Sequence, residues 1–211
     1  MINGEEFEKL PTKEKIVRIA ADIIVKEGLK KFTAKNIASR LGMTDAAIFK
    51  HFATMDDIIL SIINNYVYRC SQSAEVGISK GKDIEDKLKQ VLLSHIKVLE
   101  ETKGAVPILC FDFSRSNNQK FTKILHSFVK EYKKTLSQLF KEGQEKGIIK
   151  KDLDPEELAM FFLGSIQAKV FAKIIEQGEG PIIKNPDQFI NELFYGIMEK
   201  KEDQTKGNEN S

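Results

Sequence analysis

Tryptophan is absent from this 211-residue chain, which has only two cysteines, three histidines and five prolines. Two cysteines are too few for a disulfide-rich secreted scaffold. Cys70 and Cys110 both lie in apolar helical patterns, which is typical of reduced, buried thiols in a cytosolic protein. The histidines lack the spacing of metal ligands, and the chain offers no plausible pair of nucleophile and base. We therefore expect no metal, no cofactor and no enzymatic activity.

Long apolar runs are also missing. No stretch approaches the roughly 18 apolar residues of a membrane-spanning helix. The first ten residues, MINGEEFEKL, are acidic and lack the apolar segment of a secretory signal. The segment GISKGKD resembles a phosphate-binding loop only superficially, because it lacks the four-residue gap before Gly-Lys and a preceding strand. We expect a cytoplasmic protein with no membrane partner.

Strand signals are almost absent, whereas apolar residues recur at helical spacing along the chain. This pattern predicts an all-α fold of about nine helices. Helix starts are marked by the capping box TMDD and by the cap sequences DPEE and NPDQ. The polar residues 201–211 are expected to form a disordered tail. The predicted helices span 13–27, begin near 33, 44 and 54, span 83–102, 105–115 and 118–146, and begin again near 154 and 185.

Two of these predicted helices are very short and lie between Thr33 and His51, joined by a turn that contains Gly42. Helices of this length are marginally stable alone, but together they form a helix-turn-helix, whose second helix enters the DNA major groove. Ile48 and Phe52 provide the inner face of the second helix. Its outer face consists of Thr44, Asp45, Ala46, Phe49 and Lys50.

The charge distribution agrees with an anionic partner for this region. Between Lys9 and Met55 there are ten lysines and arginines but only four aspartates and glutamates, while the whole chain has a net charge of only +2. Threonine hydroxyls and free N–H groups at the two helix starts suit phosphate oxygens. Two alternatives remain open, namely an ordinary corner between two helices and a basic surface that faces only water.

The segment TAKNIASRLGMTDAAIFKHFATMDDI, preceded by KIVRIAADIIVKEG, resembles the N-terminal domain of the TetR family of bacterial transcriptional regulators. The shared features are an Ile-Ala pair in the second helix, a glycine before the turn, and an aromatic residue followed closely by His-Phe. Phe49 and Met55 depart from the family, which often has tyrosine and lysine there. The resemblance implies a helix-turn-helix domain at 1–55 and an effector-binding and dimerisation domain at 56–200.

The resemblance also implies roles for single residues. Lys35 and Asn36 would lie near the DNA backbone, and the outer face of the second short helix would meet the groove. Asp45 either accepts from a cytosine amine or stabilises its helix N-terminus, and His51 either contacts phosphate or packs at the junction. The residues expected to contact DNA are Thr33, Lys35, Asn36, Thr44, Asp45, Ala46, Phe49, Lys50 and His51.

The C-terminal helices have more large apolar residues than one layer of contacts needs, and Pro107 interrupts a helix in a segment, VPILCFDFSR, that resembles the family's coupling segment. A mostly apolar effector is therefore expected, although each of these residues, taken singly, fits ordinary core better. His126 and Arg115 are further polar candidates. The predicted effector residues are Leu92, His95, Ile96, Leu109, Asp112, Phe113, Phe128, Phe162, Ile166 and Gln167.

A palindromic operator requires two recognition helices about one DNA turn apart, so we expect a homodimer. The last two helices would form its interface, but the sequence does not divide their residues between core and interface. The prediction is a ligand-responsive repressor that binds double-stranded DNA; the alternative is a helical small-molecule or lipid-binding protein that does not bind DNA. The predicted interface residues are Leu158, Phe161, Ser165, Ala168, Phe189, Leu193, Phe194 and Ile197.

Overall fold

A computed structural model describes residues 4–113, 119–176 and 180–195 of the chain. Within these ranges there are ten α-helices, one short 3₁₀ helix and no strand, so the all-α prediction is confirmed. The helices are α1 (Gly4–Glu8), α2 (Thr12–Glu27), α3 (Ala34–Leu41), α4 (Asp45–Phe49), α5 (Met55–Lys80), α6 (Ile84–Glu101), α7 (Ala105–Phe113), α8 (Gln119–Glu145), α9 (Pro155–Ile175) and α10 (Pro186–Tyr195), with the 3₁₀ helix at Leu29–Lys31.

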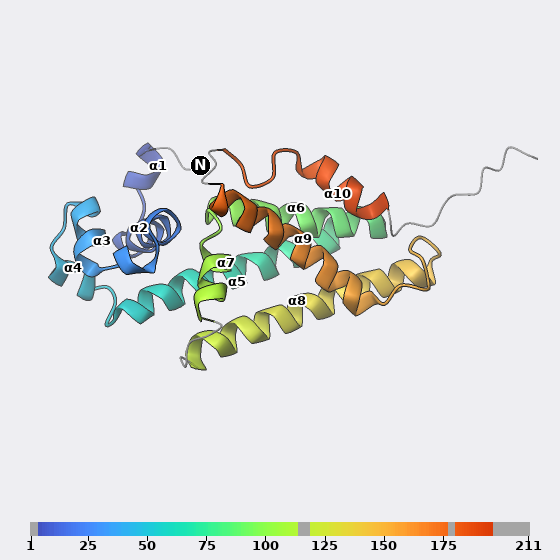
Figure 1. The fold of residues 1–211 in the computed structure, drawn as a ribbon, viewed down its shortest axis with the longest axis horizontal. Coiled ribbons are helices and arrows are strands. Elements are labelled where there is room, and N and C mark those ends of the chain that lie inside the picture. Colours follow the sequence, from blue (N-terminus) through green and yellow to red (C-terminus); the bar gives the residue numbers. More distant parts are fainter. Residues whose placement is uncertain (1–3, 114–118, 177–179, 196–211) are drawn as a thin grey trace, which may run out of the picture.

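Helices α1 to α4 gather at one end of the molecule (Figure 1). Their core consists of the apolar faces predicted from helical spacing, with Ile16, Ile23, Ile37 and Ile48 fully buried. Helix α2 packs against α3 and α5, and α3 packs against α4. The shared core gives the two short helices the rigid support that they lack alone.

The rest of the chain is a helical bundle that extends away from this end (Figure 1). Helix α5 packs along α6, α8 packs along α9, and α8 also contacts both α5 and α6. The predicted caps are present: the amide N–H groups of Thr54 and Asp57 donate to each other's side chains, at 2.9 and 3.2 Å. Asp154 caps α9 at the predicted position. Helix α5 therefore starts beside α4 and continues into the bundle without a break.

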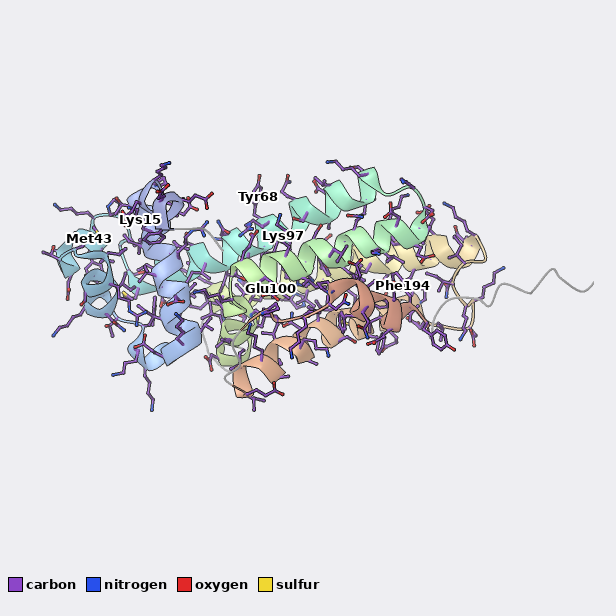
Figure 2. All side chains as sticks on the ribbon, turned by 90° about the horizontal axis from the view of Figure 1, so that it is seen from above. Lys15, Met43, Tyr68, Lys97, Glu100 and Phe194 are labelled. Carbon is purple, nitrogen blue, oxygen red and sulfur yellow. The ribbon has the colours of Figure 1, made fainter. Side chains whose placement is uncertain are left out.

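A junction between the two parts forms where α6 ends and α7 begins. Lys103 and Gly104 form this turn with positive φ angles of 52° and 73°, and α7 then contacts α2. Glu100, at the end of α6, accepts from the backbone N–H of Ile183 at 3.1 Å, which holds the segment before α10 against the junction (Figure 2). The chain thus brings α2, α6, α7 and the α10 approach together at one place.

Three sequence expectations need correction. Helix α1 was not predicted, because it depends on contacts with α2: Glu8 pairs with Lys15 at 2.8 Å, and the Lys15 ammonium lies over the Phe7 ring. Pro107 does not interrupt a helix, because it lies in the first turn of α7, where its missing N–H has no helical partner to lose. Cys70 is buried as expected, but Cys110 is only half-buried; both are free thiols.

Helix α9 alone among the described helices reaches the length and mean hydropathy, 1.6, of a membrane-spanning helix, with a third of that window buried. A core helix of a water-soluble protein passes the same test. One side of α9 packs against α8, with Phe162 and Ile166 fully buried. The other side leaves Met160, Phe161, Phe171 and Ile175 exposed.

Candidate nucleic-acid interface and buried ligand site

The turn between α3 and α4 is fixed by local backbone chemistry. Gly42 follows α3 with a φ of 63°, a left-handed conformation that favours glycine, and the N–H of Met43 donates to the Ala38 carbonyl at 2.9 Å. Thr33 and Thr44 cap the two helices, accepting from the N–H groups of Asn36 and Ala47 at 3.2 and 3.3 Å. These bonds hold α4 at a defined orientation on the end of the molecule.

Helix α4 buries only a narrow face. Ile48 is fully buried and Phe52, just after the helix, is 5% exposed, as predicted, whereas Phe49 on the opposite side is 46% exposed. Eight of the nine residues predicted to contact DNA are exposed, and Asn36 is half-buried because its side chain donates to the Lys31 carbonyl at 3.0 Å. The predicted contact surface is therefore open to a partner.

The two ambiguous residues also lie at the surface. Asp45 occupies the first turn of α4, where a carboxylate favours the helix N-terminus, so a contact with cytosine stays a prediction. His51 is exposed and not packed in the core. A phosphate contact by His51 is compatible with this position and also stays a prediction.

The basic residues of this domain divide into two groups. Arg18, Lys26 and Arg40 are neutralised by carboxylates, with Arg40 paired to both Asp22 and Glu27. Four exposed lysines around α3 and α4 form no ion pair with any described residue, and they are Lys30, Lys31, Lys35 and Lys50. Lys30 and Lys31 were not among the predicted contact residues, although they lie close to the predicted residue Thr33 in the sequence.

Inside the bundle, four aromatic rings meet at the contact of α5, α6 and α8. The hydroxyl of Tyr66 lies 2.7 Å from Nε2 of His95. The Tyr132 ring packs edge-on against His95 with centroids 5.0 Å apart, and Phe128 completes the group against Tyr66 and Tyr132 at 5.6 and 5.5 Å. We call Tyr66, His95, Phe128 and Tyr132 the aromatic cluster.

Burial sets the protonation of the aromatic cluster. It lowers the pKa of His95 from 6.5 to about 4, so the ring is neutral near pH 7. Burial also raises the pKa of Tyr66 well above 10, with further contributions from Cys70, Tyr132 and Cys110, and it raises the pKa of Tyr132 likewise. All groups in the cluster are therefore uncharged at neutral pH. Helix α7 packs against α5 and α8, which carry three of the four rings.

The residues predicted for the effector do not form one group. His95 and Phe128 belong to the aromatic cluster, whereas the Phe162 ring packs against Phe140 and Phe194 between α8, α9 and α10. Asp112 and His126 are exposed and Gln167 is half-buried, so none of them joins the buried cluster. Leu92, Ile96, Leu109 and Ile166 are buried; the side chain of Phe113 and all of Arg115 lie outside the described residues.

The predicted interface residues are now divided by burial. Leu158, Phe189 and Phe194 are buried within the chain, Ser165 and Leu193 are half-buried, and Phe161 and Ala168 are exposed. Ile197 lies outside the described residues. The exposed residues Phe161, Gly164, Ala168, Phe171 and Ile175 follow each other on α9 at alternating steps of three and four, the spacing of a helix-packing seam.

Comparison with known proteins agrees with this architecture. Residues 16–62 match the family model described as bacterial regulatory proteins, tetR family, and residues 61–196 match the model of the YsiA-like protein, C-terminal region. The chain therefore belongs to the TetR family of bacterial transcriptional regulators and is not an enzyme. The two matches meet inside α5, a few residues beyond the expected domain boundary at 55.

Individual relatives cover nearly the whole chain. The fatty acid metabolism regulator protein of Bacillus subtilis (strain 168) is 22% identical over 92% of this chain and 99% of its own. The fatty acid degradation regulator FadR from Bacillus halodurans has a similar fold, with a TM-score of 0.72, 22% identity and coverage of 89% and 97%. The ketosteroid regulator KstR2 of Mycobacterium tuberculosis has a TM-score of 0.75, 15% identity and coverage of 95% and 98%.

Proposed function

We propose that this regulator is a cytoplasmic, dimeric repressor that binds a palindromic operator and is released by a mostly apolar small molecule. The observation that supports DNA binding is the exposed outer face of α4, which includes Lys50. Lys30 and Lys31 just before α3 and Lys35 on α3 are also exposed, and none of these four lysines has an ion-pair partner among the described residues. Unpaired lysines favour DNA binding because they displace the counterions condensed on the DNA phosphates. Phe49 is available for apolar contact with a thymine methyl group.

Support for a dimer comes from α9. Phe161 is 52% exposed and Ile175 is 79% exposed, and Gly164 and Ala168 between them allow a second helix to approach closely. A copy of the same face would bury these residues, as in a four-helix interface. The twofold axis would then place two α4 helices for a palindrome with half-sites about 34 Å apart.

Support for an apolar effector comes from the bundle interior, where the buried side chains among the described residues are apolar apart from His95, Cys70 and the hydroxyls of Tyr66 and Tyr132. The names of two relatives refer to fatty acid metabolism and to ketosteroid, both largely hydrocarbon compounds. A ligand that binds the bundle better in a conformation with displaced α4 helices would release the operator, and a coupling of about 1–3 kcal/mol is typical.

The test is a band-shift titration of the full chain against the DNA upstream of its own gene, with the salt concentration varied. We expect one saturable complex whose affinity falls steeply with salt, and a dimer-to-operator stoichiometry by sedimentation. If the protein ignores both this DNA and random DNA in dilute buffer, the alternative of a helical ligand-binding protein replaces the repressor.

A further inference from the structure

The aromatic cluster has unused hydrogen-bonding capacity. Nδ1 of His95 and the hydroxyl oxygen of Tyr132 are buried and have no hydrogen-bond partner in the structure. His95 is 1% exposed and Tyr132 is 5% exposed, so neither atom reaches bulk solvent. A buried polar group without a partner is destabilising because its lost hydration is not replaced, and two such groups on adjacent rings point to a bound polar atom.

The other nitrogen of His95 is already engaged, which limits what Nδ1 can do. If the Tyr66 hydroxyl donates to Nε2, the neutral imidazole has its proton on Nδ1 and offers a donor; in the other tautomer Nδ1 is an acceptor. The Tyr132 hydroxyl can donate or accept. The pair therefore suits a carbonyl oxygen, which takes two donors, or a hydroxyl, which can do both.

A charged ligand group is disfavoured at this place. No lysine or arginine is buried among the described residues, so a carboxylate beside His95 would have no cation to pair with. Burying an unpaired carboxylate is far more costly than burying a carbonyl or hydroxyl that forms hydrogen bonds. The surroundings are otherwise apolar, with Leu92, Ile96 and Leu99 buried on the same helix as His95.

Building on the proposed function, we infer that the aromatic cluster binds the neutral polar group, a carbonyl or hydroxyl, of an otherwise apolar effector, with His95 and Tyr132 as its hydrogen-bond partners. The rings now contact one another directly, at centroid separations of 5.0 to 6.1 Å, so the ligand must part them. Helix α7 packs against α5 and α8, the helices of Tyr66 and Tyr132, and it follows the turn that contains Lys103. Parting the rings therefore moves the element that touches the DNA-binding end.

The test uses three probes with the same eight-carbon chain, 1-octanol, methyl octanoate and octanoate, titrated by calorimetry into the full chain at pH 7.5. We expect the two neutral probes to bind at least tenfold more tightly than octanoate. Tyr132→Phe removes one hydroxyl and should weaken both neutral probes about five- to tenfold while leaving octanoate unchanged. His95→Gln, which keeps a polar atom toward Tyr66, should weaken them similarly.

Tyr68→Phe is the matched control, because it removes a tyrosine hydroxyl from the same helix as Tyr66 at a position that is 65% exposed (Figure 2). The inference is overturned if octanoate binds as tightly as 1-octanol, if neither neutral probe binds, or if Tyr132→Phe behaves like Tyr68→Phe. An internal water on Tyr132 would give that last result together with a loss of stability. Operator binding by the same samples, measured in parallel, separates failure of the ligand class from failure of the repressor.

Discussion

The Lys103 ammonium donates to the carboxylate of Asp22, joining the α6–α7 turn to helix α2 across 81 residues of sequence. The same carboxylate also pairs with Lys26 at 3.2 Å and with Arg40 of α3 at 3.5 Å. Asp22 is thus the place where the bundle, α2 and the helix that braces α4 share one ionic group.

Lys103→Met should weaken the attachment of the α6–α7 turn to helix α2, because it removes the ion pair with Asp22. We expect a loss of about 0.5 to 1 kcal/mol in the free energy of unfolding, since the pair is partly exposed to solvent. Urea denaturation measures it, and Lys97→Met on α6 is the control, because Lys97 is exposed and forms no ion pair within the described residues. Equal effects of the two substitutions would show that the Asp22 contact contributes nothing.

The same contact predicts an acid dependence. Burial alone would raise the pKa of Asp22, but hydrogen bonds from Lys103 and Lys26 hold it below its ordinary value of 3.8. The ionised form is therefore favoured in the folded chain, and its contribution is complete above pH 3.8 and is lost as the pH falls through the lowered value. Lys103→Met should reduce this loss in acid unfolding, whereas Lys97→Met should leave it unchanged.

Gly104→Ala should be clearly destabilising. A Cβ at this position would lie 2.8 Å from Cγ1 of Val170 on α9, and the φ of 73° is itself unfavourable for alanine. We expect a loss of about 2 to 4 kcal/mol. Gly147→Ala is the control, since it has a similar φ of 69° but no atom within 4 Å, and it should lose only about 1 to 2 kcal/mol. Equal losses in thermal unfolding would contradict the close approach of α9.

Lys50→Ala should weaken operator binding and lower the slope of log affinity against log salt by about one, because one phosphate contact is lost. Lys30 and Lys31 should behave in the same way. Arg40→Ala makes a useful contrast: its guanidinium already pairs with Asp22 and Glu27, so the salt slope should not change. An unchanged affinity of Lys50→Ala would remove Lys50 from the interface.

Phe161→Glu should convert the proposed dimer to a monomer. The substitution places a charge, and by symmetry its copy, in the centre of the proposed α9 seam, where both would be desolvated. Sedimentation velocity measures the change, and operator affinity should fall at least a hundredfold because each half-site would bind alone. Tyr68→Glu, on α5, is the control. A Phe161→Glu protein that is still dimeric would place the interface elsewhere.

Stability should decrease as the pH falls from 6.5 towards 4, because unfolded His95 takes up a proton that the folded chain excludes, its pKa being lowered to about 4. The full effect is about 3 kcal/mol. Tyr66 and Tyr132 contact His95, and Cys70 interacts with Tyr66. Burial raises the pKa of all three groups, so they stay neutral over this range. His95→Gln should flatten the profile measured by urea unfolding, and His126→Gln, which changes an exposed histidine, should not.

Local signals accounted for most of the fold. Caps such as Thr54 and Asp154, and the glycine after α3, act within a few residues of where they stand, so the sequence locates them well. Helix α1 was missed because its stabilising partner, Lys15, belongs to another helix. The outer face of α4 was predictable for the same reason as the caps, since helical spacing alone separates Ile48 from Phe49.

The aromatic cluster was harder to predict from the sequence. His95 and Phe128 were identified, but Tyr66 and Tyr132 were not, because their roles depend on how α5, α6 and α8 pack. Periodicity marks Tyr132 as an inward residue of α8, like Phe128 and Leu136, yet it does not reveal that its hydroxyl lacks a partner. Phe162 and Phe194 were assigned to different functions, although they contact each other in one core.

Helix α5 has a mechanical consequence. Its 26 residues run unbroken from the end of the α4 segment into the bundle, a length of about 39 Å. A rod of this length that tilts by only about 5° carries its tip sideways by about 3 Å. In the proposed symmetric dimer the N-terminal ends of both α5 helices would move. A small rearrangement deep in the bundle would then change the separation of the two α4 helices, so that they no longer match the spacing of successive DNA turns.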